Sequence, residues 1–205
     1  MSDGSIVFIG DSITDSGRLQ DPEGLGDGYV RIVAERLSAA GDERTIVNTG
    51  ISGNRLPHLA SRWQVDALAH KPATLSVFVG INDVWRRFDD AEDGPTETAE
   101  FESGYRDLLT QARDDFAPRM VLVEPFLVPI NEDQRGWATD LDEKREIVAK
   151  LASEFRASFV PLHEIMTMAA ASHGARLIAS DGVHPSAFGS GVIADAWMRA
   201  EQQLS

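Results

Sequence analysis

Strand-like and helix-like segments alternate along the whole chain, and this alternation is the feature that most limits the possible folds. Short apolar, β-branched runs occupy residues 5–10, 44–50, 74–80, 119–125 and 158–163. Apolar residues recur at helical spacing in residues 28–41, 58–70, 98–116, 142–156 and 186–204. Such alternation is typical of a parallel sheet with helices on both faces. The sequence therefore predicts an α/β fold, a flavodoxin-like three-layer sandwich with a five-stranded parallel sheet, formed by a single domain over residues 1–205.

Two predicted helices present clear apolar faces. The first face carries Val30, Val33, Ala34 and Leu37, and the second carries Leu59, Trp63, Leu68 and Ala69. Two long segments, 81–97 and 125–141, show no regular pattern, and long irregular segments in a compact domain usually carry function or subunit contacts. We expect a homo-oligomer.

Composition narrows the possible partners. The 205 residues include 33 acidic and 19 Lys or Arg side chains, which gives a formal net charge of −14. Phosphate groups would be repelled, so we expect a neutral small-molecule substrate, no nucleic acid and no membrane. The chain has no cysteine, which excludes disulfides and thiolate chemistry. No run of about 18 apolar residues and no signal-like leader is present, so the expected location is cytoplasmic.

Polar and glycine residues follow directly after several predicted strands. They are Gly10-Asp11-Ser12, then residues 49–54, then residues 80–83, then Glu124-Pro125. The carboxyl ends of parallel strands lie at one edge of the sheet, and ligands of such sheets bind there. These residues are therefore expected to share a site.

Ser12 has two interpretations. A serine between a strand and a helix is most often a helix N-cap. A reactive serine needs a base, and a group that orients the base. Among five histidines, His184 stands in a turn-rich segment, with Asp181 three residues before it and Pro185 after it. One turn can return this carboxylate to the imidazole, although an Asp-initiated turn with an incidental histidine would show the same spacing.

Donors for a developing oxyanion are also available at the strand ends. They are the Ser12 N–H, the N–H of Gly53 and the side-chain amide of Asn82. Taken singly, Gly53 could be an ordinary turn glycine, and Asn82 an Asx turn or a helix cap. Their convergence on one sheet edge favours a functional role.

These residues resemble the SGNH, or GDSL-type, hydrolase family. The resemblance lies in GDSIT (10–14), Gly53 of GISGN, Asn82 of GIND, and Asp181 and His184 of DGVHP, in this order. It implies a Ser12–His184–Asp181 triad, an oxyanion hole of Ser12, Gly53 and Asn82, and neither a metal nor another cofactor. Longer matches, including GINDVWRRF and DGVHPSAFG, resemble the intracellular acetylxylan esterase branch, although the residue before the triad aspartate, often aromatic there, is Ser180.

The resemblance implies a serine esterase that removes acetyl groups from xylo-oligosaccharides or related sugars. Asp11, Trp85 and Arg86 are candidate substrate-binding residues. Asp11 and Asp83 are also candidates for bracing the loops, and Trp85 for a core or subunit contact. One alternative function is a thioesterase or lysophospholipase for longer acyl chains. Another is a non-catalytic binding protein that retains the fold.

Overall fold

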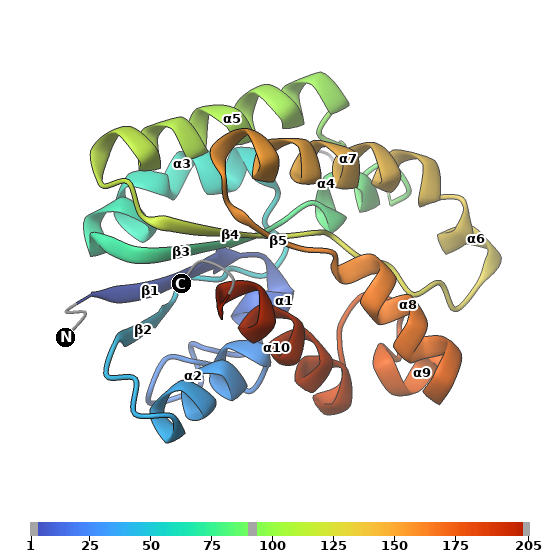
Figure 1. Cartoon of the computed structure of the whole chain (residues 1–205). Coiled ribbons are helices and arrows are strands. Elements are labelled where there is room, and N and C mark those ends of the chain that lie inside the picture. The colour runs from blue at the N-terminus through green and yellow to red at the C-terminus, as the bar shows by residue number, and fades with distance from the viewer. Residues whose placement is uncertain (1–3, 90–93, 203–205) are drawn as a thin grey trace.

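The computed structural model describes residues 4–89 and 94–202, and its centre is one parallel sheet (Figure 1). The strands are β1 (Ser5–Gly10), β2 (Thr45–Asn48), β3 (Pro72–Phe78), β4 (Arg119–Val123) and β5 (Ser158–Val160). Their order is β2-β1-β3-β4-β5 and every neighbouring pair is parallel. This order is the flavodoxin-like arrangement, so the predicted fold class is confirmed.

Helices cover both faces of the sheet (Figure 1). One face carries α3 (Leu56–Asp66), α5 (Thr98–Asp115) and α7 (Ala138–Phe155); the other carries α2 (Tyr29–Ala39), α8 (Leu162–His173) and α10 (Ala187–Gln202). Two apolar clusters fill these interfaces, one on each face. Their largest side chains include Trp63 on α3 and Trp197 on α10, and the Trp197 Nε1–H donates to Ser76 Oγ at 2.9 Å. Within the described ranges, no helix is both long and apolar enough to cross a bilayer.

The structure corrects the sequence-based boundaries in the segments 158–163 and 58–70. The predicted strand 158–163 ends at Val160, and α8 follows at once, although the sequence analysis did not predict this helix. Only Leu162 and Met166 of α8 are fully buried, so its Ala- and Met-rich sequence has a weak helical period. The predicted helix 58–70 divides into α3 and a 3₁₀ turn over Leu68–His70, which exposes Ala69 and buries Ala67 instead.

The two long segments predicted as irregular contain short helices. Residues 81–97 begin with α4 (Ile81–Trp85), and residues 125–141 contain α6 (Glu132–Arg135) and the start of α7. Two further short helices are α1 (Ser12–Asp15), directly after β1, and α9 (Ala175–Ile178). Of these, α1 and α4 follow the carboxyl ends of the neighbouring strands β1 and β3 (Figure 1).

Close backbone approach holds α1 against the loop that follows β2. A Cβ atom on Gly50 would lie 2.3 Å from Asp15 N, which is closer than a real carbon atom can come. The loop also bonds to α1, because the N–H and the hydroxyl of Ser52 donate to Asp15 Oδ2 at 3.0 and 2.7 Å. Glycine at position 50 therefore allows two strand ends to place their loops side by side.

Candidate active site

Ser12 is the first residue of α1, directly beyond the end of β1. Asp11 caps this helix, since its Oδ1 accepts from Ile13 N at 3.0 Å. The interpretation of Ser12 as the helix N-cap is therefore wrong, because Asp11 has that role and the Ser12 hydroxyl bonds elsewhere. Ser12 Oγ lies 2.9 Å from His184 Nε2, although the two residues are 172 positions apart in the chain.

His184 and Asp181 belong to one turn before α10. The ring Nδ1 of His184 lies 2.6 Å from Asp181 Oδ2. The other oxygen, Oδ1, accepts from the N–H groups of Val183 and His184 at 2.9 and 2.8 Å. The predicted return of the carboxylate to the imidazole is thus present, and the two oxygens divide between shaping the turn and orienting the ring.

The protonation of Asp181 follows from these contacts. Partial burial alone would raise the pKa of Asp181, but the hydrogen bonds from the His184 ring and from two N–H groups outweigh it. The pKa therefore lies below its ordinary value. An ionised carboxylate accepts only, so Nδ1 carries a hydrogen and the lone pair of Nε2 faces Ser12 Oγ. This geometry allows His184 to take a proton from Ser12.

Three potential oxyanion donors lie at the same sheet edge. The Ser12 N–H belongs to the first turn of α1, where N–H groups have no partner within the helix. Gly53 has a φ of +79° and lies in a turn closed by Asn54 N donating to Ile51 O at 3.1 Å. Asn82 is 3% exposed, and its Nδ2 donates to Asn54 O at 3.1 Å. One hydrogen of this Nδ2 can therefore fix the amide beside the Gly53 turn while the other serves an oxyanion.

The structure places Asp11 differently from its predicted substrate-binding role. Its side chain is fully buried, so it has no surface to offer a ligand. Burial raises the pKa of Asp11 to about 7, with a smaller contribution from the nearby charge of Asp83. Asp83 is equally buried, and burial raises its pKa to about 6, while its Oδ1 accepts from Leu56 N at 2.9 Å. Both carboxylates brace the loops.

Trp85 lies beside His184, and Arg86 lies beside Gly53. The Trp85 and His184 ring centroids are 6.2 Å apart, and Trp85 also packs on Trp137 at 5.3 Å. Arg86 forms an ion pair with Asp89, and a Cβ atom on Gly53 would lie 3.7 Å from the Arg86 guanidinium. Their contact with a substrate stays a prediction.

Gln134 is a part of the site that sequence reasoning missed. Its side-chain Nε2 donates to the backbone oxygen of Asp181 at 2.6 Å, and its Oε1 accepts from Ile130 N at 2.9 Å. A second tie between the segments is Val128 N donating to Gly182 O at 2.9 Å. A sequence signal for a helix start was present here. Gln134 follows Asn131 by three residues, and this spacing is a helix-capping pattern inside a segment that was predicted to be a loop.

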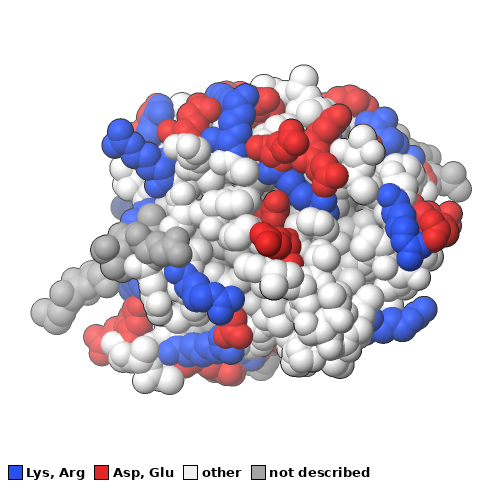
Figure 2. All heavy atoms as spheres, turned by 45° about the vertical axis from the view of Figure 1, so that its right-hand side comes forward, with Lys and Arg blue, Asp and Glu red and all other residues white. Residues whose placement is uncertain are grey.

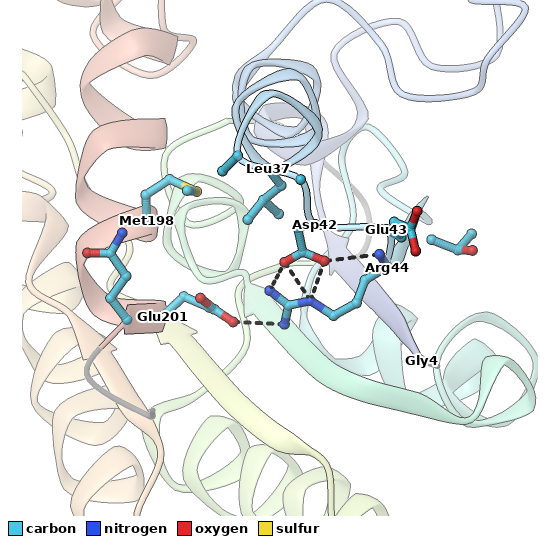
Figure 3. A pocket seen from close by; sticks show the side chains of 11 residues that line it. Gly4, Leu37, Asp42, Glu43, Arg44, Met198 and Glu201 are labelled. Atoms are coloured by element: carbon cyan, nitrogen blue, oxygen red, sulfur yellow. Dashed lines mark hydrogen bonds and ion pairs between the residues drawn. The ribbon is translucent and has the colours of Figure 1, made fainter. Parts of the chain in front are cut away.

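Cavities occur at both ends of the sheet. A hollow of about 340 Å³ touches the reacting pair and is lined by Ser12, His184, Ser16, Asp27, Ser52 and Pro185, among others. A larger one, about 710 Å³, lies near the opposite ends of the strands, beside Gly4 and Thr45 (Figure 3). There Arg44 is already paired with Asp42 and Glu201, as Figure 3 shows. Among the described residues, no His, Asp or Glu cluster suits a metal ion.

Known proteins are similar to this chain in both sequence and fold. The model of the GDSL-like lipase/acylhydrolase family matches residues 8–192. An acetylxylan esterase of Geobacillus stearothermophilus is 35% identical over 204 residues, covering 95% of this chain and 92% of that protein. The crystal structure of Axe2, an acetylxylan esterase from the same organism, superposes with a TM-score of 0.88 at 33% identity, covering 98% of this chain and 96% of the other. An Axe2 variant described as an acetyl-xylooligosaccharide esterase gives 0.87 at 34% identity, with the same coverage.

The family match spans most of the chain and includes every residue of the candidate triad. The curated relative exceeds 30% identity over nearly the whole length of both proteins. These matches show a carboxylic ester hydrolase. The chain belongs to the GDSL-like lipase/acylhydrolase family.

Proposed function

We propose that this protein is a serine esterase that hydrolyses acetyl esters on xylo-oligosaccharides or related sugars through an acyl-serine intermediate. The observation that carries the proposal is the continuous hydrogen-bond chain from Asp181 Oδ2 through the His184 ring to Ser12 Oγ. The acetylxylan esterase relative supports the substrate class. In Axe2, the variants described as catalytic mutants replace one serine and one histidine.

The first half of the reaction forms the acyl-enzyme. Ser12 Oγ attacks the ester carbonyl carbon while His184 Nε2 takes the hydroxyl proton. The carbonyl oxygen becomes an oxyanion, which accepts hydrogen bonds from Ser12 N–H, Gly53 N–H and Asn82 Nδ2. Asp181 stabilises the imidazolium that forms and keeps the ring in the correct orientation. When the tetrahedral species collapses, the C–O bond of the ester breaks and His184 protonates the departing sugar oxygen, which leaves as a hydroxyl group.

The second half returns the enzyme to its starting state. A water molecule gives a proton to His184 Nε2 while its oxygen attacks the acyl carbon. The same donors stabilise the second oxyanion. Collapse releases acetate, and the proton on His184 returns to Ser12 Oγ. Both proton transfers between Ser12 and His184 join Oγ and Nε2, which the structure already holds 2.9 Å apart.

The surroundings of Ser12 favour a short acyl group and a neutral leaving group. The hollow of about 340 Å³ at Ser12 is lined largely by small or polar residues, among them Ser16, Gly17 and Ser52. This lining differs from the wide apolar groove that an enzyme for long acyl chains would need. The face shown in Figure 2 intersperses acidic and basic side chains and has no broad basic area.

The short basic run Arg86-Arg87 is neutralised by acidic neighbours. Arg86 pairs with Asp89, and Arg87 pairs with both Glu97 and Asp140. With a net charge of −14, these pairs leave little attraction for phosphate groups. We therefore propose a neutral acetylated sugar as substrate, with neither nucleic acid nor membrane as partner.

Acetate release from acetylated xylo-oligosaccharides tests the proposal. Wild type should release acetate, and Ser12→Ala should lower kcat by about 10³-fold or more. Ser172→Ala is the matched control, because its hydroxyl lies on α8 and donates to Met168 O. Equal rates for wild type and Ser12→Ala would instead favour a non-catalytic binding protein. A higher kcat/KM for p-nitrophenyl octanoate than for p-nitrophenyl acetate would favour the thioesterase or lysophospholipase alternative.

A further inference from the structure

A second hollow, of about 670 Å³, lies close to His184 and has no part in the mechanism above. We call it the aromatic hollow and define it by its lining residues, which are Trp85, Phe88, Trp137, Gly136 and residues 131–134. Its walls come from α4 and the turn after it, from α6 and its N-cap residue, and from the two residues that precede α7. These are the two segments that the sequence analysis treated as long irregular loops.

Three aromatic rings form one continuous surface in this hollow. Phe88 stacks on Trp137, with ring centroids 5.6 Å apart and an interplanar angle of 17°. Trp137 is only 6% exposed, so it supports the other two rings from below. Phe88 is 45% exposed, and it is the stacking on Trp137 next to a hollow that distinguishes it from other exposed apolar side chains of this protein.

The aromatic hollow is connected to the reacting groups by two contacts. Trp85 lines it and also lies 6.2 Å, between ring centroids, from His184. Gln134 lines it and also holds the backbone of Asp181. Since His184 protonates the leaving alcohol, the leaving group lies on the histidine side of Ser12. A sugar chain that leaves from this side can extend over Trp85.

The chemistry of the lining matches a sugar better than a lipid or an anion. A pyranose ring has apolar C–H faces, which pack on aromatic rings, and hydroxyl groups around its edge. Asn131, Glu132 and Asp133 are exposed at the rim. Asn131 caps α6 and Glu132 pairs with Arg135, so the Asp133 carboxylate offers the open oxygen acceptors for such hydroxyls. The two carboxylates would repel a phosphate, and the polar rim would not suit a long acyl chain.

The hollows around residues 16–31 are an alternative place for the sugar chain. Their polar side chains have fewer free hydrogen-bonding groups than the aromatic hollow. Asp21 already accepts from Leu25 N and Gly26 N at 2.7 and 3.0 Å. Arg31 is paired with both Asp21 and Glu23. A sugar there would compete with existing bonds, whereas the exposed Phe88 face has no ring packed on its open side among the described residues.

We propose that the aromatic hollow is a subsite for the sugar residues next to the acetylated one. This inference rests on the proposed function, because it assumes an oligosaccharide substrate. It makes the enzyme sensitive to the length of the sugar chain. Acetyl esters on longer xylo-oligosaccharides gain contacts with Phe88 and Trp85 that an acetylated xylose cannot reach.

Chain-length dependence provides the kinetic test. The quantity is the ratio of kcat/KM for acetylated xylotetraose to kcat/KM for acetylated xylose. Wild type should show a ratio above unity, and Phe88→Ala should lower it about tenfold, the effect of losing one aromatic contact. Phe116→Ala is the matched control, since Phe116 is 42% exposed at the end of α5. A ratio unchanged in Phe88→Ala but lowered in Gln20→Ala would place the sugar in the rival hollow and overturn the proposal.

A binding experiment separates this inference from the proposed function. Unacetylated xylotetraose is titrated into Ser12→Ala, and tryptophan fluorescence is recorded. Trp63 and Trp197 are buried in the core, so a change reports on Trp85 and Trp137. Saturable quenching that weakens about tenfold with Phe88→Ala in the same background supports the subsite, even if wild type fails to deacetylate the sugar. If the fluorescence shows no saturable change, the subsite proposal is overturned. It is also overturned if Phe88→Ala loses an oligomeric state that wild type has but binds xylotetraose with unchanged affinity.

Discussion

The side-chain amide of Gln134 donates to the backbone oxygen of Asp181 at 2.6 Å, across 47 positions of the chain. This bond joins α6 to the turn that carries the triad carboxylate and His184. Gly182 makes the approach possible, since a Cβ atom there would lie 2.5 Å from Gln134 Oε1, and its φ is +87°. Gln134 is therefore a positioning residue that acts through Asp181.

Gln134→Ala should lower kcat on p-nitrophenyl acetate about tenfold with little change in KM, because the triad loses alignment rather than substrate contacts. Gln134→Glu should lower it as well, since a carboxylate cannot donate to Asp181 O. Gln64→Ala, on the exposed side of α3, is the matched control. Equal kcat values for wild type and Gln134→Ala would contradict the positioning role.

Asp181→Asn should retain the fold and lose most activity. Asparagine keeps an oxygen for the Val183 and His184 N–H groups, so the turn should survive. It presents an NH₂ group to the ring instead of an acceptor, which favours the wrong tautomer of His184. We expect kcat to fall by about 10³- to 10⁴-fold, measured with p-nitrophenyl acetate. A fall of less than tenfold with unchanged thermal stability would show that the carboxylate is dispensable.

Asn82→Ala tests the oxyanion hole. The amide touches no atom of the Asp181–His184–Ser12 hydrogen-bond chain, so its loss should leave nucleophile and base intact. Removing one oxyanion donor typically raises the barrier by about 3 to 4 kcal/mol, so kcat should fall by about 10²- to 10³-fold. Steady-state kinetics with acetyl esters measures this. A larger effect on KM than on kcat would argue for ground-state binding instead.

Two glycine substitutions should change stability in opposite directions. Gly50→Ala would push a Cβ atom into the backbone of Thr14 and Asp15, so it should lower the free energy of unfolding by about 3 kcal/mol. Gly191→Ala, in the middle of α10, meets no atom within 4 Å and should raise it by about 0.5 to 1 kcal/mol. Urea denaturation gives both values, and similar midpoints for the two variants would be inconsistent with the packing described.

Asp11 should make stability depend on pH. Burial raises its pKa to about 7, so between pH 3.8 and 7 the folded state holds a proton that the unfolded state releases. Raising the pH through this window therefore lowers the free energy of unfolding. In Asp11→Asn this contribution is absent. The free energy of unfolding of the variant, relative to that of wild type, should therefore rise by about 2 kcal/mol from pH 5 to pH 8.

Urea unfolding of both proteins at pH 5 and pH 8 measures this difference. Asp107→Asn, an exposed carboxylate on α5, is the control and should show no such gain. A difference between Asp11→Asn and wild type that stays constant across these two pH values would mean that Asp11 is ionised throughout.

Local sequence patterns predicted the fold class and several residues of the candidate site. Strand-like runs and apolar residues at helical spacing predicted the five-stranded parallel sheet and the helices on both faces. The order of the motifs placed Ser12, Gly53 and Asn82 after strands whose carboxyl ends share an edge. The turn from Asp181 to His184 was also predictable, because a three-residue spacing is closed by bonds within the turn itself.

Only the tertiary structure decided which distant groups meet. The family resemblance implied that Ser12 meets His184, and the structure shows this contact. The burial of Asp11, the bond from Gln134 to Asp181 and the stacking of Phe88 on Trp137 were not predicted, because they depend on how separate segments pack. A sequence period reports which face of a helix or strand is apolar, so it determines elements and their covered sides. It carries no information on how far a loop reaches or which side chain fills a neighbouring gap, since those depend on the packing of the whole molecule.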